Sequence, residues 1–211
     1  MNAAIRKDRK RKVFYMRKVN QDLFLANLKS GDIGLICSKS LFSTLQNWYR
    51  KRFKEGELRA SHGFYLNNPP ELTEANNILL SKATINKNIG DKTKCWIFRY
   101  AKLTHEGLEA MNAAADMAIS VGGHYSVEGI WQFAKSFFTK KMNMKEKKGV
   151  FCTEFTSDII LKGIPAKDYI QDRKPWQIDP SYQLNWFSID GKLKNWELIG
   201  FYDGEGSFFI A

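Results

Sequence analysis

No apolar run in this chain is long enough to cross a membrane, and we expect no secretory leader. Of the 211 residues 44% are hydrophobic, but Asp, Glu or Lys interrupts every stretch of helix length, whereas a spanning helix needs roughly 20 apolar residues. The basic residues near Met1 are not followed by the apolar segment of a signal peptide. We therefore expect synthesis in the cytoplasm, with delivery by a virion or a lysis system left open.

Cysteine and histidine are both scarce, which argues against a disulfide framework and against a metal centre. Each type occurs three times, and the cysteines are odd in number and widely spaced, so we expect free thiols. No two of these six residues lie closer than ten positions, and no Cys-x-x-Cys or His-x-x-x-His pattern occurs. We therefore expect no metal ion and no other cofactor. The six residues are Cys37, Cys95, Cys152, His62, His105 and His124.

Positive charge is concentrated at the amino terminus. Residues 1–18 include eight Lys or Arg residues, from Arg6 to Lys18, against the single acid Asp8, and so carry seven of the eleven net positive charges. Such a segment is typical of a solvated tail, and equally of an arm that binds nucleic acid or an anionic surface. We predict a basic arm over residues 1–18 and a single domain over 19–211, because no repeat or low-complexity linker divides the rest.

The hydrophobic pattern beyond this arm predicts an α+β fold with a mainly antiparallel sheet. Strand-like runs follow one another across the Asn67–Pro70 turn and the turn around Gly90, which favours antiparallel neighbours. After Pro165 we expect a loop that returns to one or two edge strands, including Trp196–Tyr202. The predicted strands cover residues 32–37, 61–66, 78–85 and 95–100, and the predicted helices cover 19–28, a segment through Leu41, Leu45 and Trp48, 104–121 and 153–163.

Cys152 lies where a strand-like stretch gives way to a helix. A helix amino terminus stabilises a thiolate, and the thiolate is the nucleophilic form of cysteine. On the predicted helix Cys152 shares a face with Phe155 and Ile159 and so points toward the sheet. Because unreactive cysteine is also among the most commonly buried residues, the helix alone leaves both interpretations open.

His62 alternates with Phe64 and Leu66 on one face of its predicted strand. An imidazole near Cys152 would complete the pair of groups that thiol-based acyl transfer requires. A histidine among apolar side chains is also a common hydrogen-bonded core residue, so the strand alone does not decide. We interpret the remaining residues of these two types as surface histidines, His105 and His124, and core thiols, Cys37 and Cys95.

Four short motifs occur in an order that favours a cysteine enzyme. They are Gly31-Asp32-Ile33-Gly34-Leu35, Ser61-His62-Gly63-Phe64-Tyr65-Leu66, Gly122-Gly123-His124-Tyr125 and Val150-Phe151-Cys152-Thr153-Glu154-Phe155. Over about residues 31–165 the chain resembles the circularly permuted papain-like proteins of the NlpC-type superfamily, specifically its YiiX-like and lecithin retinol acyltransferase-like branch. In that family the histidine precedes the cysteine, as it does here.

The resemblance implies a papain-like α+β fold in which a sheet that carries His62 packs against a helix that begins at Cys152. It also implies that Cys152 is the nucleophile and that His62 takes its proton and later protonates the leaving group. The backbone N–H of Cys152 would face the oxyanion of a tetrahedral intermediate. Tyr125 would help to shape the cleft.

The third polar residue of such a site is where the sequence departs from the family pattern. Family members place a Glu in a hydrophobic-Glu-Ala setting on the strand after the histidine strand, and we match this setting to Leu80-Ser81-Lys82-Ala83, where Lys82 takes the place of the acid. A charged lysine cannot accept a hydrogen bond from an imidazole. Thr84 and Asn86 share the predicted strand face of Lys82. We select Asn86 as the third residue, with a plain turn residue as the alternative.

The resemblance therefore implies a cysteine hydrolase or acyltransferase that cleaves an amide or an ester through a thioester on Cys152. Members of the superfamily act on peptidoglycan peptides, on other amides and on lipid esters, so the substrate stays open. Aromatic residues from Trp131 to Phe138 are candidates for an acyl pocket or for plain core. The alternative is a catalytically degenerate papain-like binding protein that holds nucleic acid or an anionic surface through the arm Arg6–Lys18.

Overall fold

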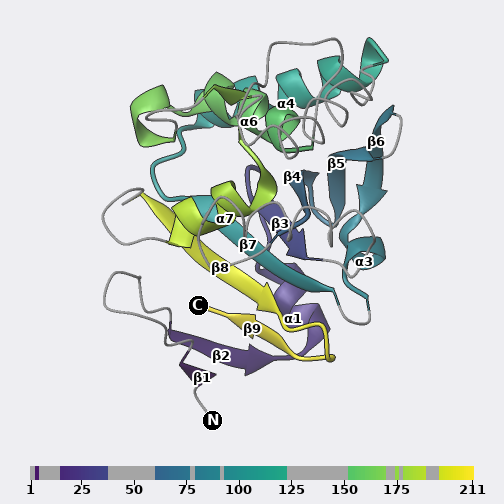
Figure 1. The fold of residues 1–211 in the computed structure, drawn as a ribbon, viewed down its shortest axis with the longest axis vertical. Helices are drawn as coiled ribbons and strands as arrows, with labels where there is room; N and C mark the ends of the chain where they lie inside the picture. The colour runs from purple at the N-terminus through teal and green to yellow at the C-terminus, as the bar shows by residue number, and fades with distance from the viewer. Residues whose placement is uncertain are drawn as a thin grey trace, which may run out of the picture.

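The computed structural model describes residues 3–4, 15–37, 60–76, 79–90, 93–122, 152–169, 174–175, 178–188 and 195–211. Within these ranges nine strands form one antiparallel sheet, in the order β1-β2-β9-β8-β7-β3-β4-β5-β6 (Figure 1). The strands are β1 (Ala3–Ala4), β2 (Tyr15–Val19), β3 (Ile33–Cys37), β4 (His62–Asn68), β5 (Glu71–Asn76), β6 (Leu79–Thr84), β7 (Lys94–Tyr100), β8 (Trp196–Tyr202) and β9 (Phe208–Ile210). The helices are α1 (Gln21–Ala26), α3 (Ile85–Asn88), α4 (His105–Ser120), α6 (Cys152–Gly163) and α7 (Pro180–Ser188), with a 3-10 turn at Ala166–Asp168. The expected α+β class with an antiparallel sheet is confirmed.

Helices pack on both faces of this sheet, and two apolar cores result. Residues of α4, α6 and α7 belong to one core, and residues of α1 and α3 to the other. In β7, Trp96 and Phe98 enter the first core, whereas Cys95 and Ile97 enter the second, because successive side chains of a strand point to opposite faces. The continuous apolar run of β7 is therefore that of a strand covered on both sides.

Short polar side chains cap the amino termini of α1, α4 and α7, where such residues are common. The hydroxyl of Thr104 accepts a hydrogen bond from the N–H of Gly107 at 3.1 Å, which confirms Thr104 as the predicted cap of α4. The carboxylate of Asp179 accepts one from the N–H of Ser181 at 2.9 Å. The Asp179 cap fixes where α7 begins.

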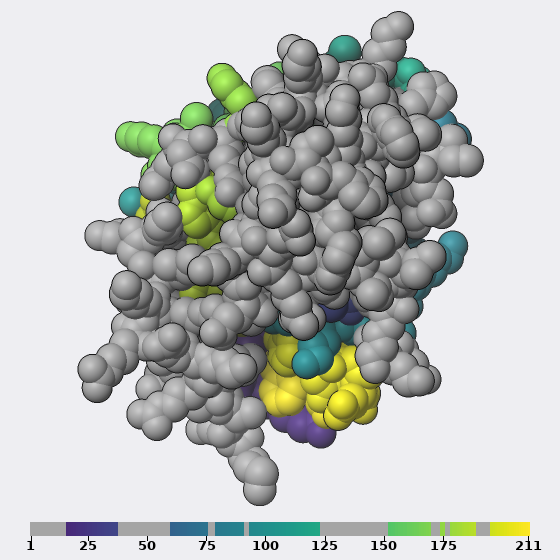
Figure 2. Space-filling view, in the orientation of Figure 1, coloured from purple at the N-terminus to yellow at the C-terminus, as the bar shows by residue number. Residues whose placement is uncertain are grey.

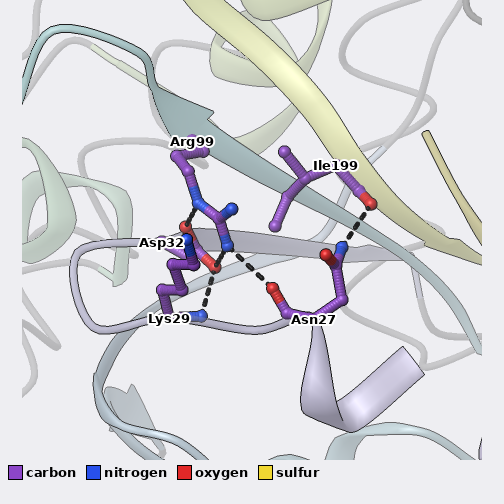
Figure 3. Close-up of polar contacts among 5 residues, drawn as sticks. All are labelled: Asn27, Lys29, Asp32, Arg99 and Ile199. Carbon is purple, nitrogen blue, oxygen red and sulfur yellow. Dashed lines mark hydrogen bonds and ion pairs between the residues drawn. The ribbon is translucent and has the colours of Figure 1, made fainter. Parts of the chain in front are cut away.

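The turn before β3 contains a buried ion pair (Figure 3). Asp32 is fully buried, and Arg99 of β7 donates from Nε and Nη2 to its two carboxylate oxygens at 2.7 and 2.8 Å. The N–H of Lys29 donates to the same carboxylate at 2.7 Å, and Arg99 also donates to the carbonyl oxygen of Asn27 at 2.8 Å. Burial raises the pKa of Asp32 even against these partners. The Gly31-Asp32 motif thus fastens the turn to the neighbouring strand.

The two ends of the described chain adjoin in the sheet. Arg17 of β2 pairs with Ile210 of β9, and Val19 pairs with Phe208. Figure 2 shows the same arrangement at the surface, where the purple residues of the amino-terminal part lie against the yellow residues of the carboxy-terminal strands. The predicted boundary after residue 18 therefore falls inside β2, while residues 1–2 and 5–14 of the basic arm lie outside the described residues.

Three expectations about the elements are corrected. Residues 71–76, which the sequence pattern left in a connection, form β5 between β4 and β6. Residues 180–188, expected as loop, form α7. β8 is an interior strand between β7 and β9 and not an edge strand. Both missed elements are rich in polar residues, and they form because neighbouring elements cover them, which overrides local propensity.

Two other expectations fall outside the part of the chain that the structure describes. They are the helix through Leu41, Leu45 and Trp48 and the aromatic-rich segment from Trp131 to Phe138. Within the described ranges, no helix combines the length and the apolar character that crossing a membrane requires.

Candidate active site

Helix α6 places Cys152 at its first residue, against the sheet. Cys152, Phe155 and Ile159 are all at most 3% exposed and belong to one apolar core, so the predicted buried face of this helix is confirmed. The other side of α6 packs on α4 at two glycines: a Cβ atom at Gly107 would lie 2.6 Å from the carbonyl oxygen of Gly163. The helix crossing is therefore close enough to hold α6, and with it Cys152, in one position.

His62 begins β4, and a carboxylate holds its ring. The Nε2 atom of His62 lies 2.7 Å from Oε2 of Glu74 on β5, and the two side chains are 18% and 4% exposed. By strand alternation both side chains belong to the sheet face that α1 and α3 cover. Because Nε2 is engaged by Glu74, Nδ1 is the ring nitrogen left for the thiol of Cys152.

The thiol reaches His62 where the pairing between β4 and β5 ends. The last pair of this ladder toward the start of β4 is Phe64 with Glu74, so Gly63 lies beyond the ladder. The Cys152 side chain is hydrogen-bonded to the His62 ring, to the N–H of Gly63 and to the N–H of Thr153. Three donors therefore converge on one sulfur, one from an imidazole and two from the backbone.

These contacts determine the charge state of the pair. Burial alone would raise the pKa of Cys152, but the charge of His62, its hydrogen bond and the two backbone N–H groups outweigh burial and lower that pKa below its usual value. Burial alone would lower the pKa of His62, but the charge and hydrogen bond of Cys152, and then those of Glu74, raise it to about 10. Both shifts favour a thiolate beside an imidazolium at neutral pH.

The segment just before α7 joins the elements that carry the two residues. Thr153, which follows Cys152, donates its hydroxyl proton to the carbonyl oxygen of Ile178 at 2.6 Å. Three residues later, the buried hydroxyl of Ser181 donates to the carbonyl oxygen of Ala60 at 2.7 Å and accepts from the N–H of the same residue. Residues 178–181 thus connect the start of the cysteine helix with the chain that enters the histidine strand.

The structure brings together two of the predicted site residues, Cys152 and His62. Asn86, our choice for the third position, is exposed and accepts a hydrogen bond from Gln21 at 3.3 Å. Lys82 pairs with Asp116 at 3.1 Å.

Two further residues predicted near the cleft are Thr84 and Tyr125. Thr84 ends β6, where it pairs with Glu71. Tyr125 lies outside the described residues.

Glu74 is the residue that the sequence interpretation missed, and Lys82 does not stand in its place. The sequence pattern places the third residue on β6, one strand too late, because it does not indicate a strand over residues 71–76. The signal was present: Leu72-Thr73-Glu74-Ala75 contains the Glu-Ala dipeptide and follows the histidine strand directly across a Pro-Pro turn. Counting strands from that turn would have located the acid.

The other described histidine and thiols are His105, Cys95 and Cys37. His105 is exposed and pairs with Glu109 at 3.2 Å. Cys95 is fully buried, and burial raises its pKa; Cys37 is partly exposed. Among the residues that the structure describes, no group of three or more His, Cys, Asp or Glu side chains could hold a metal ion.

A thiol, an imidazole and a carboxylate in hydrogen-bonded series can carry out nucleophilic chemistry at a carbonyl carbon. No known family model matches the chain, and a search among curated proteins finds no significant relative. The function is therefore inferred from this geometry and from the residues that form it.

Proposed function

We propose that this protein is a cysteine hydrolase or acyltransferase that cleaves an amide or an ester through a thioester on Cys152. The observation that carries the proposal is the series Cys152, His62 and Glu74, in which the thiol pKa is lowered and the imidazole pKa is raised. A thiol held only as a core residue has no need of three hydrogen-bond donors. Cys95, buried without such donors, has a raised pKa instead.

The acylation step follows from these contacts. The Cys152 thiolate attacks the carbonyl carbon of the substrate, a C–S bond forms, and the carbonyl π electrons move to oxygen. The N–H of Cys152, at the start of α6, is placed to donate to this oxyanion. When the intermediate collapses, the bond to the leaving group breaks and the His62 imidazolium gives that group its proton.

The deacylation step reverses the role of His62. Now neutral, the ring takes a proton from water, or from an acceptor alcohol or amine, as that nucleophile attacks the thioester. The C–S bond breaks, the product carries the new bond, and Cys152 leaves as the thiolate beside the restored imidazolium. Glu74 keeps the ring oriented and stabilises its positive charge in both steps.

Features of the fold support the circularly permuted papain-like interpretation within this proposal. The histidine strand precedes the cysteine helix in the chain, the helix packs against the antiparallel sheet, and Glu74-Ala75 follows on the next strand. The degenerate alternative depended on an absent acid, so the contact of Glu74 with His62 favours the enzyme. Peptidoglycan peptides, other amides and lipid esters all contain the carbonyl group that this chemistry needs.

Selective alkylation tests the proposal. We expect iodoacetamide at pH 7 to modify Cys152 faster than Cys37, as followed by mass spectrometry of peptides, because alkylation requires the thiolate. His62→Ala should slow the reaction at Cys152 about tenfold or more, since an ordinary thiol is only a few per cent ionised at this pH. Equal rates in the wild type and His62→Ala would refute the thiolate–imidazolium pair.

A further inference from the structure

A second polar side chain touches the carboxylate that holds His62. The Nδ2 atom of Asn88 donates to Oε2 of Glu74 at 3.3 Å, and this is the same oxygen that lies 2.7 Å from Nε2 of His62. Asn88 is the last residue of the short helix α3. One carboxylate oxygen therefore has an imidazole on one side and an amide on the other.

Helix α3 holds Asn88 in a fixed place. Ile85, its first residue, is fully buried in the core on that face, and the N–H of Ile85 donates to the carbonyl oxygen of Pro70 at 3.0 Å. Pro70 immediately precedes β5, the strand that carries Glu74. The amide and the carboxylate are thus positioned by the same turn.

We propose that Asn88 is a positioning residue of the catalytic series and acts on His62 through Glu74; this inference rests on the proposed function. Its amide carries no charge at any pH and donates to the ionised form of Glu74. Such a donor favours the charged carboxylate over the protonated one and selects the oxygen that faces the ring. The imidazolium of His62 then keeps its counter-charge, which helps to hold the pKa of this ring above its usual value.

Charged or titrating groups also lie on the elements next to Glu74. His62 of β4 contacts its carboxylate, Cys152 of α6 contacts His62, and Lys87 precedes Asn88 on α3. On β6 the residue opposite Glu74 is the uncharged Ser81, and the ammonium group of Lys82 pairs with Asp116 of α4.

A matched pair of variants tests the proposal. Asn88→Ala removes the donor, whereas Asn86→Ala removes the same side chain two positions earlier on α3, where it contacts Gln21 and not the dyad. The readout is the alkylation rate of Cys152 by iodoacetamide from pH 4 to pH 11, in which the limb at high pH follows loss of the proton from His62. We expect Asn88→Ala to move this limb downward by about half a unit to one unit, as loss of one charge-assisted hydrogen bond would, and Asn86→Ala to leave it in place.

A double-mutant cycle separates positioning from a general structural effect. In a Glu74→Gln background, Asn88→Ala should shift the limb no further, because the amide acts only through the carboxylate. Equal limbs in Asn88→Ala and wild type, or an equal shift in both backgrounds, would overturn the role of Asn88. Failure of the proposed function itself gives a different result: an ordinary thiol profile in the wild type that His62→Ala leaves unchanged.

Discussion

Ser181 and Ala60 share two hydrogen bonds although 121 positions separate them in the chain. The serine hydroxyl satisfies both the N–H and the carbonyl oxygen of Ala60, two residues before His62. The same segment accepts the hydroxyl proton of Thr153 at the carbonyl oxygen of Ile178. The relative position of His62 and Cys152 therefore depends on a residue that belongs to neither element.

Ser181→Ala should weaken both stability and thiol reactivity. The buried backbone groups of Ala60 lose their partner, at a cost of about 1–3 kcal/mol, and the chain entering β4 is no longer held. We expect a lower midpoint in urea and slower alkylation of Cys152. Ser120→Ala is the control, since that hydroxyl bonds only Met117 at the exposed end of α4; an equal loss in both variants would contradict the role of Ser181.

The pH dependence of acyl transfer should be bell-shaped. Because the pKa of Cys152 is lowered, the thiolate persists below the usual titration range of a thiol. Protonation of this thiolate gives the acidic limb of the profile. Because the pKa of His62 is raised to about 10, the proton needed by the leaving group is lost as the pH rises through that value. Initial rates with an alkyl amide, whose amine leaving group needs that proton, measure both limbs across pH 4–11; a basic limb near pH 6.5 would contradict the raised value.

Glu74→Gln should narrow that profile without unfolding the protein. Removing the negative charge that contacts the ring lowers the pKa of His62, by about 1–3 units where a pair is this close. The acidic and basic limbs then approach one another. Glu71→Gln, on the same strand but exposed, should leave both limbs unchanged, and an equal effect of the two substitutions would indicate a nonspecific charge effect.

Arg99→Leu should destabilise the fold in a pH-dependent way. The substitution leaves the fully buried Asp32 without its ion-pair partner, which costs about 3–5 kcal/mol. Burial already raises the pKa of Asp32 in the folded state, and loss of Arg99 raises it further. The penalty is therefore complete above the raised folded pKa and shrinks as the pH falls toward 3.8, the unfolded value. Urea unfolding at pH 7 and pH 4.5 checks this; an equal loss at both would contradict it.

Gly107→Ala should disturb the crossing of α4 and α6. The new methyl group would lie 2.6 Å from the backbone oxygen of Gly163, a contact that only movement of one helix relieves, at about 1–3 kcal/mol. Gly90→Ala meets nothing within 4 Å and serves as the control. Thermal unfolding followed by circular dichroism should show a lower midpoint for Gly107→Ala alone, and equal midpoints would exclude a tight crossing.

Much of the fold could be predicted from patterns that depend on nearby residues. The buried face of α6, the cap at Thr104 and the apolar strands β3 and β7 all follow from periodicity and from local hydrogen bonding. β5 could not be read in this way, because its residues include two glutamates and one asparagine and only neighbouring strands make it a strand. Because β5 is not predicted, the sequence indicates Lys82 and Asn86 for the third position in place of Glu74.

The contact between His62 and Cys152 followed from motif order and not from either residue alone. Hydrogen bonds that join distant segments, such as Thr153 with Ile178 or Asn88 with Glu74, leave no periodic trace in the sequence. They depend on the angle at which helices meet the sheet, which is set by packing. This is why the sequence predicted the contact between His62 and Cys152 but not the residues that position these two side chains.

The order of strands also separates Arg17 and Lys18 from the thiol. Arg17 and Lys18 are exposed on β2, and β2 lies five positions from β4 in the sheet, roughly 24 Å at the usual spacing of strands. A polyanion bound at β2 would therefore not present its own bonds to Cys152. Such binding would change how long the protein stays near its target, and so its effective concentration there, and would leave the chemical step itself unaltered.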